Sequence, residues 1–254
     1  MKTLFSSVII LFFISCFWSC KDKLEVQQVS GENIEIDDSI TDDSEINAFI
    51  EPYKTSIEDE MNKILSYTPK AMYKNDTPYN TAIGNMMADA VFEVANPVFY
   101  QRFNDSIDAV LLNYGGIRAG INKGKITTRT AYNIMPFENM VVVAKLDHKG
   151  VEQMVEYLSK AKKAHPISNM SIKLNGNWKL LDFRIADNAI VKGQFYYIAT
   201  SDYLVNGGDN MTFFQEAEAI YPTDYKLRSL LIDYFEANDT IRSMPDRRFQ
   251  MIKQ

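Results

Sequence analysis

From residue 46 onward the sequence alternates between two hydrophobic periods, which restricts the chain to folds that combine helices with strands. Some segments repeat apolar residues every three or four positions, as amphipathic helices do, and others are short apolar or β-branched runs typical of strands. The predicted helices cover residues 46–65, 81–95, 128–134, 147–163 and 225–236. The predicted strands cover residues 108–113, 140–146, 171–174, 180–185, 195–200 and 248–252. Because the two kinds of element alternate irregularly, we predict a single α/β (α+β) domain with a mixed β-sheet flanked by helices.

Polar side chains stand where three of the predicted helices begin. Ser44, Thr81 and Asp147 precede amphipathic patterns, and such residues are preferred as N-caps because their side chains accept hydrogen bonds from free backbone N–H groups. Pro52 falls inside the first pattern and predicts either its first turn or a kink.

Both cysteines of the chain, Cys16 and Cys20, lie at its N-terminal end. The rest of the sequence therefore has no cysteine for an internal disulfide, and its stability has to come from a hydrophobic core. Residues 1–19 have the pattern of a lipoprotein signal peptide, in which Lys2 precedes a short apolar run. Cys20 is the predicted lipidated residue, Cys16 is a second candidate, and an ordinary secretory signal is the alternative. We expect a lipid-anchored protein of the bacterial cell envelope, on the periplasmic face or at the cell surface.

Residues 20–45 are predicted to be an acidic, flexible tether, and residues 46–254 the folded domain. Acidic residues with few apolar neighbours do not bury enough surface to become ordered. The formal net charge of the whole chain is −6, and its basic residues do not cluster. These features argue against a nucleic-acid polymer as a partner but leave room for a single nucleotide, which one or two arginines can hold.

The first candidate binding segment is Asn113-Tyr114-Gly115-Gly116-Ile117-Arg118, which follows a predicted strand. Two adjacent glycines let a ligand approach the backbone N–H groups closely, and the guanidinium of Arg118 suits a phosphate. A plain Gly-Gly turn with a surface arginine is the alternative for this segment alone.

Two further segments carry aromatic rings. Phe137 follows Pro136 and is either a platform for stacking against a base or an ordinary core residue. Tyr203 is followed by Gly207, Gly208 and Asp209, so a ring, a flexible backbone and a carboxylate stand close together. Asp209 could accept hydrogen bonds from the two hydroxyls of a ribose, or it could make a local turn bond. Together with Asn113 and Arg118, these residues predict a pocket for a nucleotide or nucleoside.

Four segments in this order resemble the C-terminal, substrate-binding domain of the 5′-nucleotidase family. They are residues 83–90, 113–118, 134–139 and 206–209. The resemblance implies that Phe137 and Tyr203 enclose the base and that Asp209 binds the ribose hydroxyls. It also implies that Asn113 lies near the base and that Arg118 faces the phosphate. The predicted substrate-binding set is Asn113, Gly115, Gly116, Arg118, Phe137, Tyr203, Gly207, Gly208 and Asp209.

The sequence departs from the family pattern at three positions. Thr77 stands where an arginine is frequent, Ala82 where an asparagine is usual, and Tyr114 where a third glycine is usual. The missing arginine weakens the phosphate half of the expected pocket more than its nucleoside half.

The only histidines of the sequence are His148 and His165, and neither lies in a metal-binding motif. We interpret them as a solvated residue at a helix start and a loop residue. The resemblance implies that the two catalytic metal ions of the family are bound in an N-terminal metallophosphoesterase domain. We therefore predict no catalytic residue, metal site or cofactor in this chain, with divalent metals only in a partner.

Three functions remain open for such a chain. It could be the nucleotide-binding half of a split 5′-nucleotidase whose metal site is in a separate metallophosphoesterase subunit. It could be a stand-alone binder of nucleosides or nucleotides for sensing or scavenging, without hydrolysis. The third alternative is an interaction module with a degenerate pocket.

Overall fold

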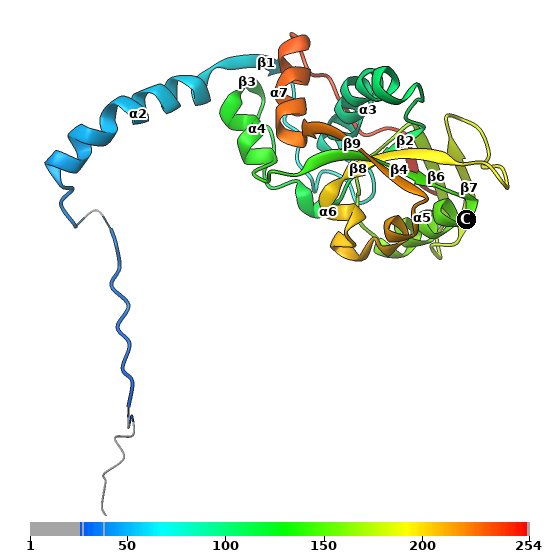
Figure 1. Ribbon diagram of the computed structural model, residues 1–254, viewed down its shortest axis with the longest axis horizontal. Coiled ribbons are helices and arrows are strands. Elements are labelled where there is room, and N and C mark those ends of the chain that lie inside the picture. Colours follow the sequence, from blue (N-terminus) through cyan, green and yellow to red (C-terminus); the bar gives the residue numbers. More distant parts are fainter. Residues whose placement is uncertain (1–25, 27, 38, 253–254) are drawn as a thin grey trace, which may run out of the picture. The chain divides into compact units, whose positions relative to one another are not determined.

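A computed structural model describes residues 26, 28–37 and 39–252 of the chain (Figure 1). The chain separates into two units, Met1–Ile50 and Glu51–Gln254. The predicted signal peptide, Cys16 and Cys20 lie outside the described residues. In the predicted tether, the described residues before Ser44 form no helix or strand, and they are exposed.

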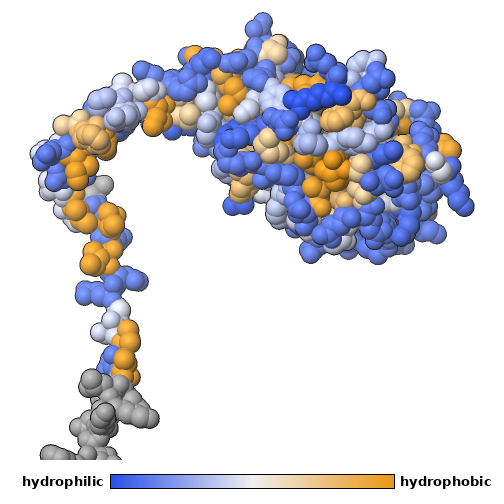
Figure 2. Space-filling model, viewed as in Figure 1, coloured by the Kyte–Doolittle hydropathy of each residue, from blue (hydrophilic) through white to orange (hydrophobic). Residues whose placement is uncertain are grey.

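Helix α2 (Ser44–Asn62) occupies the first predicted helical segment, with Ser44 as its first residue instead of its cap and Pro52 inside it. The helix ends before Ile64, because residues Ile64–Thr68 form strand β1 and pair with β3 (Gly124–Thr127). None of the residues of α2 is buried, and Figure 2 shows apolar side chains at its surface. The apolar period thus predicted the helix correctly but gave no information on what it packs against.

The central sheet has five strands in the order β5-β2-β8-β4-β9. Its strands are β5 (Ile167–Ser168), β2 (Ala109–Leu111), β8 (Tyr196–Ser201), β4 (Met140–Leu146) and β9 (Ala219–Lys226). Strands β2 and β8 run parallel, whereas the other neighbouring pairs are antiparallel. This arrangement confirms the predicted mixed sheet.

Helices cover both faces of the central sheet (Figure 1). Successive residues of β2 pack on opposite faces of the sheet. Val110 belongs to the core that includes residues of α3 (Ala82–Phe103) and α7 (Leu227–Ala237). Leu111 belongs to the core that includes residues of α5 (His148–Ala161). Val110 and Leu111 are completely buried. A strand buried on both faces reads as a continuous apolar run, which is why β2 and β4 could be predicted from sequence.

A smaller sheet extends the core on the α5 side. It consists of β10 (Phe249–Ile252), β6 (Met170–Asn175) and β7 (Leu180–Ile185), in the order β10-β6-β7. The remaining short elements lie in the connections between strands. They are α4 (Thr128–Ile134), α6 (Asp202–Val205), η2 (Tyr114–Gly116), η3 (Gly208–Asn210) and η4 (Thr212–Glu216).

Besides the end of α2, two further helix boundaries differ from the prediction. Helix α3 continues past residue 95 to Phe103 although it contains Pro97, because the completely buried side chain of Phe99 extends its apolar face. Helix α7 begins at Leu227 and not at 225, since β9 runs to Lys226 against β4. The predicted caps Thr81 and Asp147 are confirmed, as their side chains accept the N–H groups of Gly84 and Gly150. Within the described part of the chain, we find no helix with the length and apolar character needed to cross a membrane.

Candidate functional site

A pocket of about 260 Å³ lies where three chain segments meet at one edge of the central sheet. Strands β2 and β8 are parallel neighbours, so the segments that follow them emerge at the same edge, as at the binding sites of many α/β proteins. The third segment connects α4 to β4. We call this the glycine-loop pocket, and its lining residues are Asn113, Gly115, Gly116, Arg118, Phe137, Asn139, Tyr203 and Asp209.

The structure brings seven of the nine predicted binding residues into the lining of this pocket. Gly207 and Gly208 do not line it, and Asn139 lines it without having been predicted. Asn139 stands two residues after Phe137 in a segment already singled out, so the position of the segment was the only signal for it.

The carboxylate of Asp209 is held in place by two neutral donors. The amide Nδ2 of Asn113 donates to its Oδ2 at 2.8 Å, and the hydroxyl of Tyr203 donates to its Oδ1 at 3.1 Å. The hydroxyl of Tyr157 also donates to the backbone carbonyl of Asp209, at 2.8 Å. Asp209 itself has a left-handed backbone with φ of 51°. Because each carboxylate oxygen can accept more than one hydrogen bond, Asp209 keeps acceptor capacity for a ligand.

Gly116 and Gly208 are required by close packing. A Cβ atom on Gly116 would lie 2.8 Å from Oδ1 of Asn113. A Cβ atom on Gly208 would lie 2.5 Å from the ring of Tyr203 and 2.6 Å from its carbonyl oxygen. Gly116 therefore lets the Asn113 side chain pack against the backbone, and Gly208 does the same for the Tyr203 ring. In these positions both side chains donate to Asp209.

Phe137 is not a core residue, because 38% of its surface is exposed. This excludes the alternative that its side chain serves only to fill the interior. The ring of Tyr203 is also exposed, at 45%, so both rings of the pocket have apolar surface available to a ligand. The guanidinium of Arg118 lies 5.5 Å from the centroid of the Phe137 ring.

Arg228, which the sequence did not single out, holds the segment that carries Phe137. Its side chain is 8% exposed and donates to the carbonyl oxygens of Met135 and Phe137, each at 3.3 Å. It also forms an ion pair with Glu138. Hydrogen bonds from Lys226 and Arg228 lower the pKa of the Glu138 carboxyl group. An arginine in the first turn of a predicted helix carries no sequence signal for this role.

His165 is a loop residue, as predicted, and its side chain is buried. It is 5% exposed, and its Nδ1 accepts the backbone N–H of Tyr114 at 3.2 Å. Burial lowers the pKa of His165 to about 4, although the nearby charge of Asp209 acts in the opposite direction. His148 lies as expected at the start of α5, with its Nε2 3.4 Å from Glu152.

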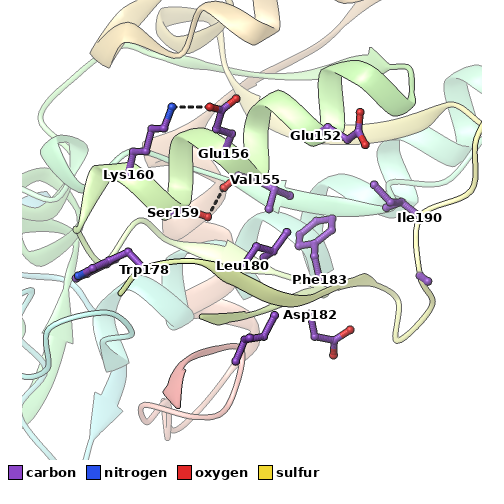
Figure 3. Close-up of a pocket in the computed structure, with 12 residues that line it drawn as sticks. Glu152, Val155, Glu156, Ser159, Lys160, Trp178, Leu180, Asp182, Phe183 and Ile190 are labelled. Atoms are coloured by element: carbon purple, nitrogen blue, oxygen red, sulfur yellow. Dashed lines mark hydrogen bonds and ion pairs between the residues drawn. The ribbon is translucent and has the colours of Figure 1, made fainter. Parts of the chain in front are cut away.

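A larger pocket lies elsewhere. A groove of about 620 Å³ lies between α5 and β7, and we call it the helix–strand groove. Figure 3 shows Val155, Leu180, Phe183 and Ile190 around its apolar floor. Its remaining lining residues are Glu152, Glu156, Ser159, Lys160, Trp178, Leu181, Asp182 and Ala189. None of the predicted binding residues lies there.

Over residues 26, 28–37 and 39–252, the structure brings together no group of three or more His, Cys, Asp or Glu side chains that could hold a metal ion. The lining of the glycine-loop pocket combines two rings, an arginine, a carboxylate and amide groups on a glycine-rich backbone.

The fold agrees with the comparison with known proteins. The family model for the 5′-nucleotidase, C-terminal domain, matches residues 63–216, and the chain belongs to this family. The trifunctional nucleotide phosphoesterase protein YfkN of Bacillus subtilis is 28% identical over 229 residues, which cover 81% of this chain and 15% of that protein. The cell wall protein Lmo0130 of Listeria monocytogenes is 26% identical over 209 residues, covering 73% of this chain and 26% of that protein.

Among solved structures, the 5′-nucleotidase precursor of Thermus thermophilus superimposes with a TM-score of 0.68 at 19% identity. The superposition covers 81% of this chain and 43% of that one, and it shows that the folds are alike. The chain thus spans about a quarter or less of the two curated relatives described above and less than half of this structural neighbour.

Proposed function

We propose that this chain is the nucleotide- and nucleoside-binding half of a split 5′-nucleotidase. In this proposal a separate metallophosphoesterase subunit supplies the divalent metal ions and hydrolyses the phosphate ester. The observation that carries it is the glycine-loop pocket, where seven predicted residues of the family pattern converge.

The pocket offers one kind of contact for each part of a nucleotide. The rings of Phe137 and Tyr203 are exposed and can stack on a base, which contributes about 1–3 kcal/mol per ring. Asp209 is oriented by Asn113 and Tyr203 and can accept hydrogen bonds from ribose hydroxyls. The Arg118 guanidinium is exposed beside this pair and can bind a phosphate.

The test of binding and the test of hydrolysis are separate. Calorimetric titration should show adenosine and AMP binding to the purified protein. The protein alone should release no phosphate from AMP with any divalent metal, whereas adding a companion metallophosphoesterase should give phosphate release that depends on both chains. Metal-dependent hydrolysis that stays with this chain through purification would contradict the split arrangement.

The alternative is a stand-alone binding protein for sensing or scavenging. It is supported by the lining of the glycine-loop pocket, whose rings, arginine, carboxylate and amides are all suited to binding a ligand. It predicts the same titrations but no stimulation of any companion metallophosphoesterase. Phosphate release in the presence of a companion metallophosphoesterase therefore distinguishes the split enzyme from the stand-alone binding protein.

We also propose that Cys20 carries the lipid that attaches the protein to a membrane of the cell envelope. A partner on the same membrane would then gain effective concentration without additional contacts. Cys20→Ala should move the protein from the membrane fraction to the soluble fraction, and Cys16→Ala should not. The reverse result would identify Cys16 as the lipidated residue.

A further inference from the structure

His165 is absent from the lining of the glycine-loop pocket and lines a neighbouring cavity that shares Gly115 and Asp209 with it. It nevertheless contacts the segment that forms one wall, because its Nδ1 accepts the backbone N–H of Tyr114. Tyr114 stands between Asn113 and Gly115, which both line the pocket. The N–H of Tyr114 lies at the start of the short helix η2, where no preceding turn supplies an acceptor.

His165 also lies close to Tyr157, which binds the backbone of Asp209. The rings of His165 and Tyr157 lie 5.5 Å apart, and the Tyr157 hydroxyl donates to the carbonyl of Asp209. Asp209 in turn accepts from Nδ2 of Asn113, the residue before Tyr114. His165, Tyr157, Asp209 and the Asn113–Tyr114 segment therefore form a closed circuit of contacts beneath the pocket.

We infer that His165 is a positioning residue of the binding site: by accepting the Tyr114 N–H, it fixes the glycine turn so that Asn113 can orient Asp209 toward a ligand. This inference rests on the proposed nucleoside-binding function. It requires a neutral imidazole with its proton on Nε2, because a proton on Nδ1 would oppose the Tyr114 N–H. The lowered pKa of the buried imidazole is consistent with that state.

The tautomer can be measured in the unaltered protein. Imidazole ¹⁵N spectra at neutral pH should show His165 uncharged, protonated at Nε2, with Nδ1 as an unprotonated acceptor. A signal for a protonated Nδ1 would overturn the inference whatever the protein binds. This measurement does not depend on any variant being folded.

The decisive variants are His165→Asn and His165→Leu, whose new side chains have nearly the same size and shape. The Asn side chain can offer its oxygen to the Tyr114 N–H, and the Leu side chain cannot. His165→Leu should weaken adenosine binding by about tenfold or more, because the unanchored turn adopts its binding geometry less often. His165→Asn should stay within about threefold of the wild type by the same reasoning. Tyr114 amide exchange should become faster in the Leu variant alone.

The exposed neighbour Lys163 provides the control, since Lys163→Ala should change neither binding nor exchange. A folded His165→Leu protein that binds adenosine like the wild type would overturn the role of His165 and leave the proposed function intact. A wild-type protein that binds no nucleoside would instead overturn the proposed function, and the positioning role with it. Equal losses in the Asn and Leu variants would show a packing role and not an acceptor role.

Discussion

The glycine-loop pocket and the helix–strand groove differ most clearly in the state of their charged groups. The groove is larger, at about 620 Å³ against about 260 Å³. Three of its four charged lining residues are nevertheless paired within the protein: Glu156 with Lys160, and Asp182 with Lys173 and Arg184. In the pocket, Asp209 accepts hydrogen bonds from neutral side chains, and Arg118 forms no ion pair with any residue that the structure describes.

This difference indicates that the smaller pocket is built to receive a charged or strongly polar ligand. A paired surface charge gains little from a new partner, because it would first have to give up the old one. An oriented carboxylate and an unpaired guanidinium can bind a ligand without that exchange. Volume alone would have favoured the groove.

The largest effect on binding is expected for Gly208→Ala. The new Cβ would lie 2.5 Å from the Tyr203 ring and 2.6 Å from the Tyr203 carbonyl oxygen, so the ring has to move away from Asp209. Loss of one stacking ring and its hydrogen bond should weaken adenosine binding by about 3 kcal/mol in calorimetry. Gly176→Ala is the matched control, because its Cβ would meet nothing within 4 Å, and it should bind normally. Normal binding by Gly208→Ala would show that the Tyr203 ring has no part in the site.

Arg118→Ala should separate nucleotides from nucleosides. Loss of a charged hydrogen bond to phosphate should weaken AMP binding by about 1.5–3 kcal/mol, while adenosine binding changes little. Arg129, which is paired with Glu58 at the surface, supplies the control variant Arg129→Ala. An equal loss for AMP and adenosine would place Arg118 at the base, next to Phe137, and not at the phosphate.

Tyr203→Phe should have a smaller effect, because the stacking ring remains and only the hydroxyl is lost. Without the hydrogen bond to Oδ1, Asp209 is less firmly oriented. Adenosine binding should weaken by about 0.5–1.5 kcal/mol, and 2′-deoxyadenosine, which presents one hydroxyl fewer, should be less affected. If both nucleosides lose the same affinity, Asp209 does not recognise the vicinal hydroxyls.

Leu181→Ala in the helix–strand groove should have the smallest effect. Its side chain is 51% exposed, so we expect changes within about 0.5 kcal/mol in both adenosine binding and the free energy of unfolding. Calorimetry and denaturant titration measure the two quantities. A clear loss of adenosine affinity in this variant would mean that the groove contributes to the site, contrary to the comparison above.

Much of the site was predictable because its residues are contiguous in sequence and follow apolar strands. The glycine pairs at 115–116 and 207–208 mark backbone positions where a side chain would collide, and the order of the segments predicted that they would meet. Which glycines line the pocket could not be predicted, since Gly208 packs against the Tyr203 ring and Gly207 against Gln215, and neither lines the pocket.

The supporting residues were missed for a physical reason. Arg228 and His165 act across 91 and 51 residues of sequence, and their roles depend on tertiary contacts that no local pattern records. Strand β9 was not predicted for the same reason. Its many exposed positions and Pro222 hide the strand pattern in the sequence, and the strand forms because it pairs with the edge of β4. A period of apolar residues predicts an element, but not its partner.

Titration of adenosine into Phe137→Ala, with a denaturation curve alongside, tests directly whether the glycine-loop pocket binds a base. Phe137 is substantially exposed, so the variant should remain stable and lose about 1–3 kcal/mol of binding free energy. The fully buried Phe214 provides the contrast, because Phe214→Ala should lose about 3–5 kcal/mol of stability. A folded Phe137→Ala protein that binds adenosine as tightly as the wild type would contradict the account.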